Sequence, residues 1–171
     1  MKKATFLIVL FISVNKIHAQ CDSSLIGNWR VVSVKTEDGF FNFLTDSMSV
    51  FPGAYNNGAD SAKQALMDIH KMMYGSIEFD FTTASKLSMR FMGELMINDT
   101  KYCFNKKSNL IMVTSQNSLG EYITDEWPGH IKDGLLFITM SVKGDTQEEA
   151  PTFTLQKMPK LGKMPENRHL P

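Results

Sequence analysis

The stretch IEFDFTTASKLSMRF, from Ile77 to Phe91, decides the fold of this chain. Large apolar residues take every second position on either side of a polar break, which is the pattern of two half-buried strands. Similar short segments follow at 95–97, 102–104, 110–114, 121–127, 135–142 and 152–157. Turn residues separate them, among others at 98–100, 118–120, 128–129 and 133–134. Because no helical segment lies between these strands, we expect an antiparallel barrel or sandwich and not a parallel sheet.

A strand and one helix precede this run of strands. The segment from Asn28 to Thr36 is rich in valine and ends before a turn, so it predicts the first strand. Between Ala59 and Tyr74, apolar residues recur at spacings of three and four, and Gly75 follows as a stop signal. We therefore expect an all-β fold with one amphipathic helix inserted after the first strand.

The first 19 residues are expected to be a cleaved signal peptide. Lys2 and Lys3 precede an uncharged apolar run at 4–14, and Ala19 supplies the small residue that signal peptidase requires. An apolar run of about 11 residues is too short to cross a bilayer, which disfavours a retained membrane anchor. Cleavage between Ala19 and Gln20 predicts a secreted or periplasmic protein.

The cleavage site leaves a second interpretation, in which Cys21 carries a lipid anchor. The residue before a lipidated cysteine is normally small, whereas Gln20 is not, so plain secretion is favoured. The expected domain covers residues 20–158, and the tail at 159–171 is polar, contains proline and lacks periodicity.

The charge balance excludes one class of partner. Lys+Arg and Asp+Glu number 18 each, and removal of the three lysines of the signal leaves a formal charge of −3. A nucleic-acid-binding domain normally carries a basic stripe or a strong basic excess, so no nucleic acid is expected as a partner.

Two cysteines give two alternatives for Cys103. An exported chain with an even number of cysteines permits a bond between Cys21 and Cys103. Since Tyr102 and Phe104 flank Cys103 on a strand, aromatic rings that face the core would turn the cysteine outward, towards the N-terminal segment. The other interpretation is a free buried thiol.

The start of the first strand carries a family resemblance. Gly27-Asn28-Trp29, just after the expected signal, resembles the G-x-W that opens lipocalin-like proteins of the calycin superfamily, and most closely the secreted bacterial ones. The resemblance implies an up-and-down barrel whose closed end is plugged by Trp29, with the basic residue Lys157 of the last strand over its ring. The chain departs from the family in having no helix after the barrel.

The resemblance also implies a ligand site inside the barrel. A barrel of about eight strands holds either its own side chains or one small ligand, and ligand sites are mostly apolar. The partner expected from this pattern is a small apolar ligand under a helical lid. The alternative is a structural or protein-interaction module with a filled barrel, using segment 40–58 or an outer strand face. The expected lining residues are Phe79, Phe81, Met89, Phe91, Tyr102, Phe104, Met112, Tyr122, Phe137 and, from the helix, Met73.

A catalytic role is the third alternative and has the least support. His70, His130 and His169 lack metal-ligand spacing to one another or to cysteine, so no metal site is expected. The chain has no nucleophile elbow and no phosphate-binding loop. No catalytic residue and no cofactor is therefore assigned, although a hydrolase built on His70 and a scattered carboxylate would escape this search.

Overall fold

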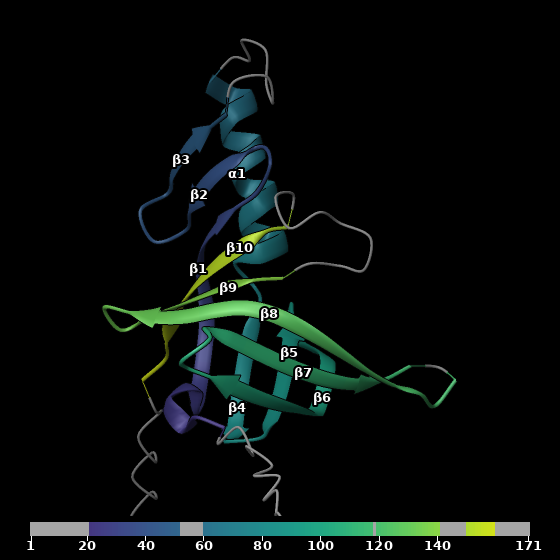
Figure 1. Cartoon of the computed structure of the whole chain (residues 1–171). Helices are drawn as coiled ribbons and strands as arrows, with labels where there is room; N and C mark the ends of the chain where they lie inside the picture. Colours follow the sequence, from purple (N-terminus) through teal and green to yellow (C-terminus); the bar gives the residue numbers. More distant parts are fainter. Residues whose placement is uncertain (1–20, 52–59, 118, 141–149, 160–171) are drawn as a thin grey trace, which may run out of the picture.

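A computed structural model describes residues 21–51, 60–117, 119–140 and 150–159 of the chain. The expected signal peptide and nearly all of the expected C-terminal tail lie outside these residues. Figure 1 shows a barrel of strands with one helix beside its upper end. The secondary-structure elements, in chain order, are η1 (Ser23–Leu25), β1 (Gly27–Lys35), β2 (Gly39–Asn42), β3 (Ser47–Val50), α1 (Asp60–Tyr74), β4 (Glu78–Thr83), β5 (Lys86–Phe91), β6 (Glu94–Asn105), β7 (Leu110–Gln116), β8 (Tyr122–Lys132), β9 (Leu135–Thr139) and β10 (Thr152–Lys157).

The barrel consists of β1 and the run from β4 to β10. Each strand from β4 onward pairs antiparallel with the next along the chain, and β10 pairs with β1 to close the sheet. The predicted all-β, antiparallel up-and-down barrel with a single helix is therefore confirmed. The helix comes after β3, because a short hairpin of β2 and β3 follows the first strand.

Strand β1 is shared between two parts of the sheet. Its first half, Gly27 to Arg30, pairs with β4, whereas Ser33 to Lys35 pairs with β2. Its other edge pairs with β10 along almost the whole strand, and a bulge between Val31 and Ser33 shifts that register. Bulges bend a strand and increase its twist, and this bulge lies where the partner of β1 on its other edge changes from β4 to β2.

The helix packs against this upper part of the sheet. Leu66, Met67 and His70 are buried on its inner face. The His70 ring stacks on Phe41 of β2 at 3.8 Å between centroids, and its Nδ1 lies 2.9 Å from the Leu66 carbonyl oxygen. Tyr74 contacts Phe153 of β10 at 5.7 Å between centroids. These contacts join α1 to both β2 and β10.

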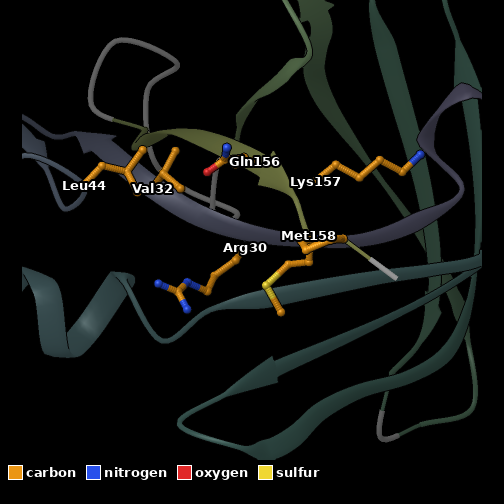
Figure 2. Close-up of a pocket in the computed structure, with 7 residues that line it drawn as sticks. Arg30, Val32, Leu44, Gln156, Lys157 and Met158 are labelled. Atoms are coloured by element: carbon orange, nitrogen blue, oxygen red, sulfur yellow. The ribbon is translucent and has the colours of Figure 1, made fainter. Parts of the chain in front are cut away.

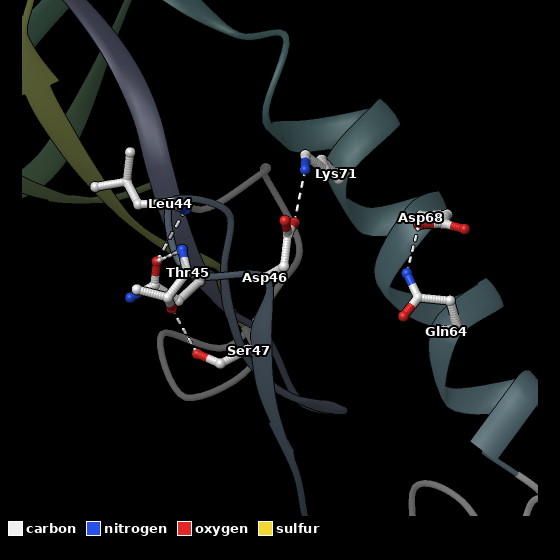
Figure 3. A network of polar contacts seen from close by, with 8 residues as sticks. Leu44, Thr45, Asp46, Ser47, Gln64, Asp68 and Lys71 are labelled. Carbon is white, nitrogen blue, oxygen red and sulfur yellow. Dashed lines mark hydrogen bonds and ion pairs between the residues drawn. The ribbon is translucent and has the colours of Figure 1, made fainter.

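A polar contact holds the helix to the β2–β3 turn. Figure 3 shows the Lys71 ammonium pointing at the Asp46 carboxylate, 2.6 Å away. Both side chains are about half exposed, so the pair contributes at most about 1 kcal/mol. Within the turn, Asn42 Oδ1 accepts hydrogen bonds from the backbone N–H groups of Leu44 and Thr45.

The lower end of the barrel is closed by η1 and Trp29. The Trp29 indole N–H donates to the Leu25 carbonyl at 2.7 Å, and Leu25 is fully buried. The Lys157 ammonium lies 5.3 Å from the centroid of the Trp29 ring. The predicted contact between these two residues is confirmed, and a cation over an indole contributes about 0.5–1 kcal/mol at an exposed site.

The disulfide between Cys21 and Cys103 is also confirmed. It ties the start of the described chain to β6, and the backbone N–H of Asp22 donates to the Phe104 carbonyl beside it. Cys103 points away from the face that carries Tyr102 and Phe104, as the alternation of the strand requires.

Two expected turns are instead interior parts of long strands. Residues 98–100 belong to β6, where Asp99 has a φ of +47° and the register against β5 shifts at two bulges. Pro128 and Gly129 lie within β8. A Cβ on Gly129 would come within 2.9 Å of the Ile111 Cδ1, so this glycine serves close packing inside the sheet.

Gly27→Ala tests the closed end. Gly27 has φ +133°, and a Cβ there would lie 2.4 Å from the Lys157 Cε. We expect a loss of about 1–3 kcal/mol in the free energy of unfolding, because the backbone is strained and Lys157 is pushed off Trp29. Urea unfolding and tryptophan fluorescence measure these effects. Gly93→Ala is the control: its φ is also positive, at +84°, but a Cβ there meets open space. Equal losses and unchanged fluorescence would contradict this assignment.

Cys21→Ser/Cys103→Ser tests the tether. The bond spans 82 residues, and the chain-entropy model gives about 4 kcal/mol for a loop of that size. We expect the double variant to unfold at a clearly lower urea concentration than the oxidised protein. An unchanged midpoint would show that the bond adds nothing to stability.

Candidate functional site

Four of the predicted lining residues lie together in the interior of the barrel. Phe79, Phe81, Tyr102 and Phe104 are almost fully buried. The rings of Phe81 and Tyr102 meet edge to face at 4.9 Å between centroids, and Phe79 contacts Trp127 at 6.4 Å. The lower interior is thus packed with the protein's own aromatic side chains.

Three other predicted lining residues lie on the outside of the barrel. Met112 pairs with Glu126, Phe137 pairs with His130, and Tyr122 is 74% exposed. Their strands instead turn their neighbours inward, and these are Ile111, Val113, Trp127, Leu136 and Ile138. The expectation that all nine strand residues share the inner face is therefore wrong for Met112, Tyr122 and Phe137. Met73 is 44% exposed on the outer side of α1.

Met89 and Phe91 lie at the other end of the barrel, towards the β5–β6 turn. Met89 is partly buried, packs against the core and pairs with Phe79 on one side and Ile97 on the other. Phe91 is partly exposed at the last position of β5. Here the inner face is still apolar, but its side chains are no longer fully covered.

Solvent reaches the inner face at this end. Asp125 pairs with Val113, two residues from the buried Trp127, so alternation places it on the inner face, yet it is exposed. Ile97 and Ile123, which share that face, are partly exposed as well. The barrel is therefore packed at the Trp29 end and accessible at the opposite end, where Met89 and Ile97 of the inner face are partly exposed. Ser115, Ile123 and Asp125 belong to the part of the β7–β8 hairpin that pairs with neither β6 nor β9, and Figure 1 shows this hairpin projecting beyond the barrel.

Tyr102 joins the packed interior to the β4–β5 turn. Its hydroxyl donates to the Thr83 carbonyl at 2.8 Å. Burial, with a smaller contribution from the negative charge of Asp22, raises the pKa of Tyr102 to about 12. Burial also raises the pKa of Tyr74. Both phenols are held neutral, which suits side chains that pack in the core.

The two histidines that the structure describes, His70 and His130, lie apart in different surroundings. His70 is buried between α1 and β2, whereas His130 stacks on Phe137 outside the barrel at 4.9 Å between centroids. His169 lies outside the described residues. In the part of the chain that the structure describes, no group of three or more His, Cys, Asp or Glu is placed to hold a metal ion.

A second concave feature lies on the outer wall, where β10 runs beside β1. Figure 2 shows this pocket, which has a volume of about 150 Å³. It combines the cationic Arg30 and the amide of Gln156 with apolar side chains. Its lining residues are Arg30, Val32, Leu44, Gln156, Lys157, Met158 and Pro159. No pattern in the sequence singled out this pocket, because it is created by the register of β1 against three neighbours.

Comparisons with known proteins give no relative from which a site could be transferred. No family model matches the chain, and no curated protein and no solved structure matches it significantly. Within the described residues, α1 is neither long nor apolar enough to span a bilayer. The class defined by fold and site is an eight-stranded antiparallel barrel, packed at one end and accessible at the other.

Alkaline unfolding tests the environment of Tyr102. The phenol ionises near pH 10 in the unfolded chain and near pH 12 in the folded one, so the unfolded state releases its proton first as the pH rises. The contribution of Tyr102 to the free energy of unfolding is therefore fully present below about pH 10 and is lost between about pH 10 and 12. In Tyr102→Phe the free energy of unfolding should fall less steeply with pH. Part of the fall that remains should come from Tyr74, because burial raises its pKa as well. Thermal unfolding from pH 9 to 11.5 measures it.

Tyr122→Phe is the matched control, because it removes the same hydroxyl from an exposed position on the outer face. This variant should retain the alkaline decline of the parent protein. If Tyr102→Phe declines as steeply as the parent protein, the buried phenol is not responsible.

Proposed function

We propose that this protein is an exported, lipocalin-like binding protein that holds a small apolar ligand at the accessible end of its barrel. The observation that carries the proposal is the change along the inner face, from packed rings around Trp127 to partly exposed apolar side chains at Met89 and Ile97. Ligand sites are concave, mostly apolar and supplied with few polar groups.

Three features support the family and the compartment. The G-x-W motif has Trp29 at the closed end with Lys157 over its ring, as the resemblance implies. The disulfide of Cys21 fits an oxidising compartment, where such bonds form and persist. The sequence at 1–19 has the charge and apolar pattern of a signal peptide. We infer secretion, or export to the periplasm, rather than lipidation at Cys21.

The competing function is a protein-interaction module without a small ligand. It is favoured by exposed apolar side chains, each 44–60% exposed, on α1 and around the β5–β6 turn. These are Ile69, Met72, Met73, Met92, Leu95 and Met96. Flexible methionine side chains suit surfaces that adapt to a partner. A barrel that binds no apolar probe would leave this function as the better one.

Met89→Gln tests ligand binding at the accessible end. A polar amide on the inner face should weaken binding of a fluorescent apolar probe, such as a naphthalene sulfonate or a fatty-acid analogue, by several-fold or more, because it must be desolvated against the ligand. Displacement titration with the oxidised protein measures the affinity. Thermal unfolding of each variant confirms that the barrel is intact.

Arg90→Gln is the matched control, because Arg90 follows Met89 on β5 and faces the other side of the sheet. We expect this variant to bind the probe like the parent protein. The proposal fails if the parent protein shows no displaceable binding, or if both variants bind equally well.

A further inference from the structure

The outer pocket lies beside the stretch of β1 where the neighbouring strand on one side changes from β4 to β2. β4 accompanies β1 as far as Arg30, and β2 joins it from Ser33 onward. Between these points the bulge against β10 leaves Val32 as the extra residue. Val32 lies outside the core cluster and is nevertheless only 6% exposed. It forms an apolar floor of the pocket, beside the side chain of Arg30 on the same strand.

The apolar walls of the pocket are held by the backbone. Leu44 comes from the β2–β3 turn, where its N–H donates to Asn42 Oδ1 at 3.0 Å. Met158 is fixed on the opposite side, because its N–H donates to the Asn28 carbonyl at 2.8 Å. Pro159 follows Met158 along the chain and completes the wall. The pocket is therefore built on fixed main chain, although Leu44 itself is 59% exposed.

The polar side of the pocket is cationic. Arg30 and Gln156 are directly opposite each other in the β1–β10 register. Figure 2 shows Arg30 and Met158 extending to the same side of β1, whereas Lys157 extends away from them towards Trp29. The aliphatic part of Lys157 therefore lines the pocket, and Arg30 supplies the positive charge.

Arg30 has no ion pair within 4.0 Å and no side-chain hydrogen bond among the described residues. The nearest acid in the register is Glu78, which is opposite Arg30 on β4 and also opposite Arg90 on β5. A guanidinium presents donors in a fixed fork that matches a carboxylate. The apolar floor beside this fork suits a short hydrocarbon group.

We propose that this pocket binds the carboxylate of a small amphipathic acid, with Arg30 as its anion partner and Val32, Leu44 and Met158 around its apolar part. A volume of about 150 Å³ is below the roughly 300–1,000 Å³ of drug-sized sites, so the occupant has few heavy atoms. Two sources share this chemistry: a free short-chain acid, and the C-terminal residue of a peptide. The site is separate from the inner face of the barrel.

Titrations of the oxidised, ¹⁵N-labelled protein with butyrate and with N-acetyl-glycyl-valine test the proposal. We expect shifts of the Arg30 Nε–H and the Gln156 side-chain amide signals in NMR spectra, and none with butyramide or butylamine at the same concentration. Tighter binding of butyrate identifies a free acid as the occupant, and tighter binding of the peptide identifies a chain terminus. If neither carboxylate moves these signals, the proposal is overturned.

Arg30→Gln and Leu44→Ser separate the two halves of the site. Loss of the charged hydrogen bonds in Arg30→Gln should weaken carboxylate binding by about tenfold or more. Leu44→Ser should remove the preference for butyrate over acetate, and its exposed position keeps the barrel intact. Arg90→Gln is the control, because Arg90 faces the same outer surface but does not line the pocket. Equal binding by Arg30→Gln and Arg90→Gln would also overturn the proposal.

Discussion

The antiparallel pairing of β1 with β10 is the constraint on which the rest of the structure depends. It joins the first strand to the last and leaves no free edge between them, which is how a barrel avoids the exposed backbone of an open sheet. The same pairing brings Lys157 over Trp29, because these two residues are opposite each other in the register. The pairing that closes the sheet therefore also places the contact that covers the lower end of the barrel.

The bulge in β1 separates two environments. Below it, β1 is a barrel strand whose Trp29 faces the packed interior. Above it, β1 continues into a sheet with β2 and β3, and α1 covers that sheet through His70 and Tyr74. The extra residue, Val32, lies at the boundary between these two environments and also lines the outer pocket.

The sequence predicted the fold class and those contacts that depend on a motif or on the alternation of side chains along a strand. The alternation from Ile77 to Phe91 predicted the meander, and the G-x-W motif with the last strand predicted the contact of Trp29 with Lys157. The alternation of Cys103 with the aromatic residues on either side of it indicated that its side chain points outward, towards its partner. Each of these inferences needs only local periodicity or one resemblance.

What could not be predicted depends on register. Alternation shows which residues of a strand share a face, but it does not say which face is the core, so Met112 was preferred over Ile111. Pro128 was interpreted as a turn, although it lies just beyond the last β8–β9 pair and its missing N–H breaks no ladder there. Asp99 resembled a turn residue because a bulge and a turn both favour a positive φ.

The position of β1 in the barrel has a consequence for synthesis. The chain leaves the ribosome N-terminus first, so β1 must wait until residues 152–157 have emerged before its second edge is covered. The Cys21–Cys103 bond needs only the chain up to residue 103, and once formed it holds the start of the chain near β6. An unpaired strand edge is a site of aggregation in a folding chain. The disulfide therefore limits how far β1 can move from β6 in any state in which the bond is formed and the β1–β10 edge is open.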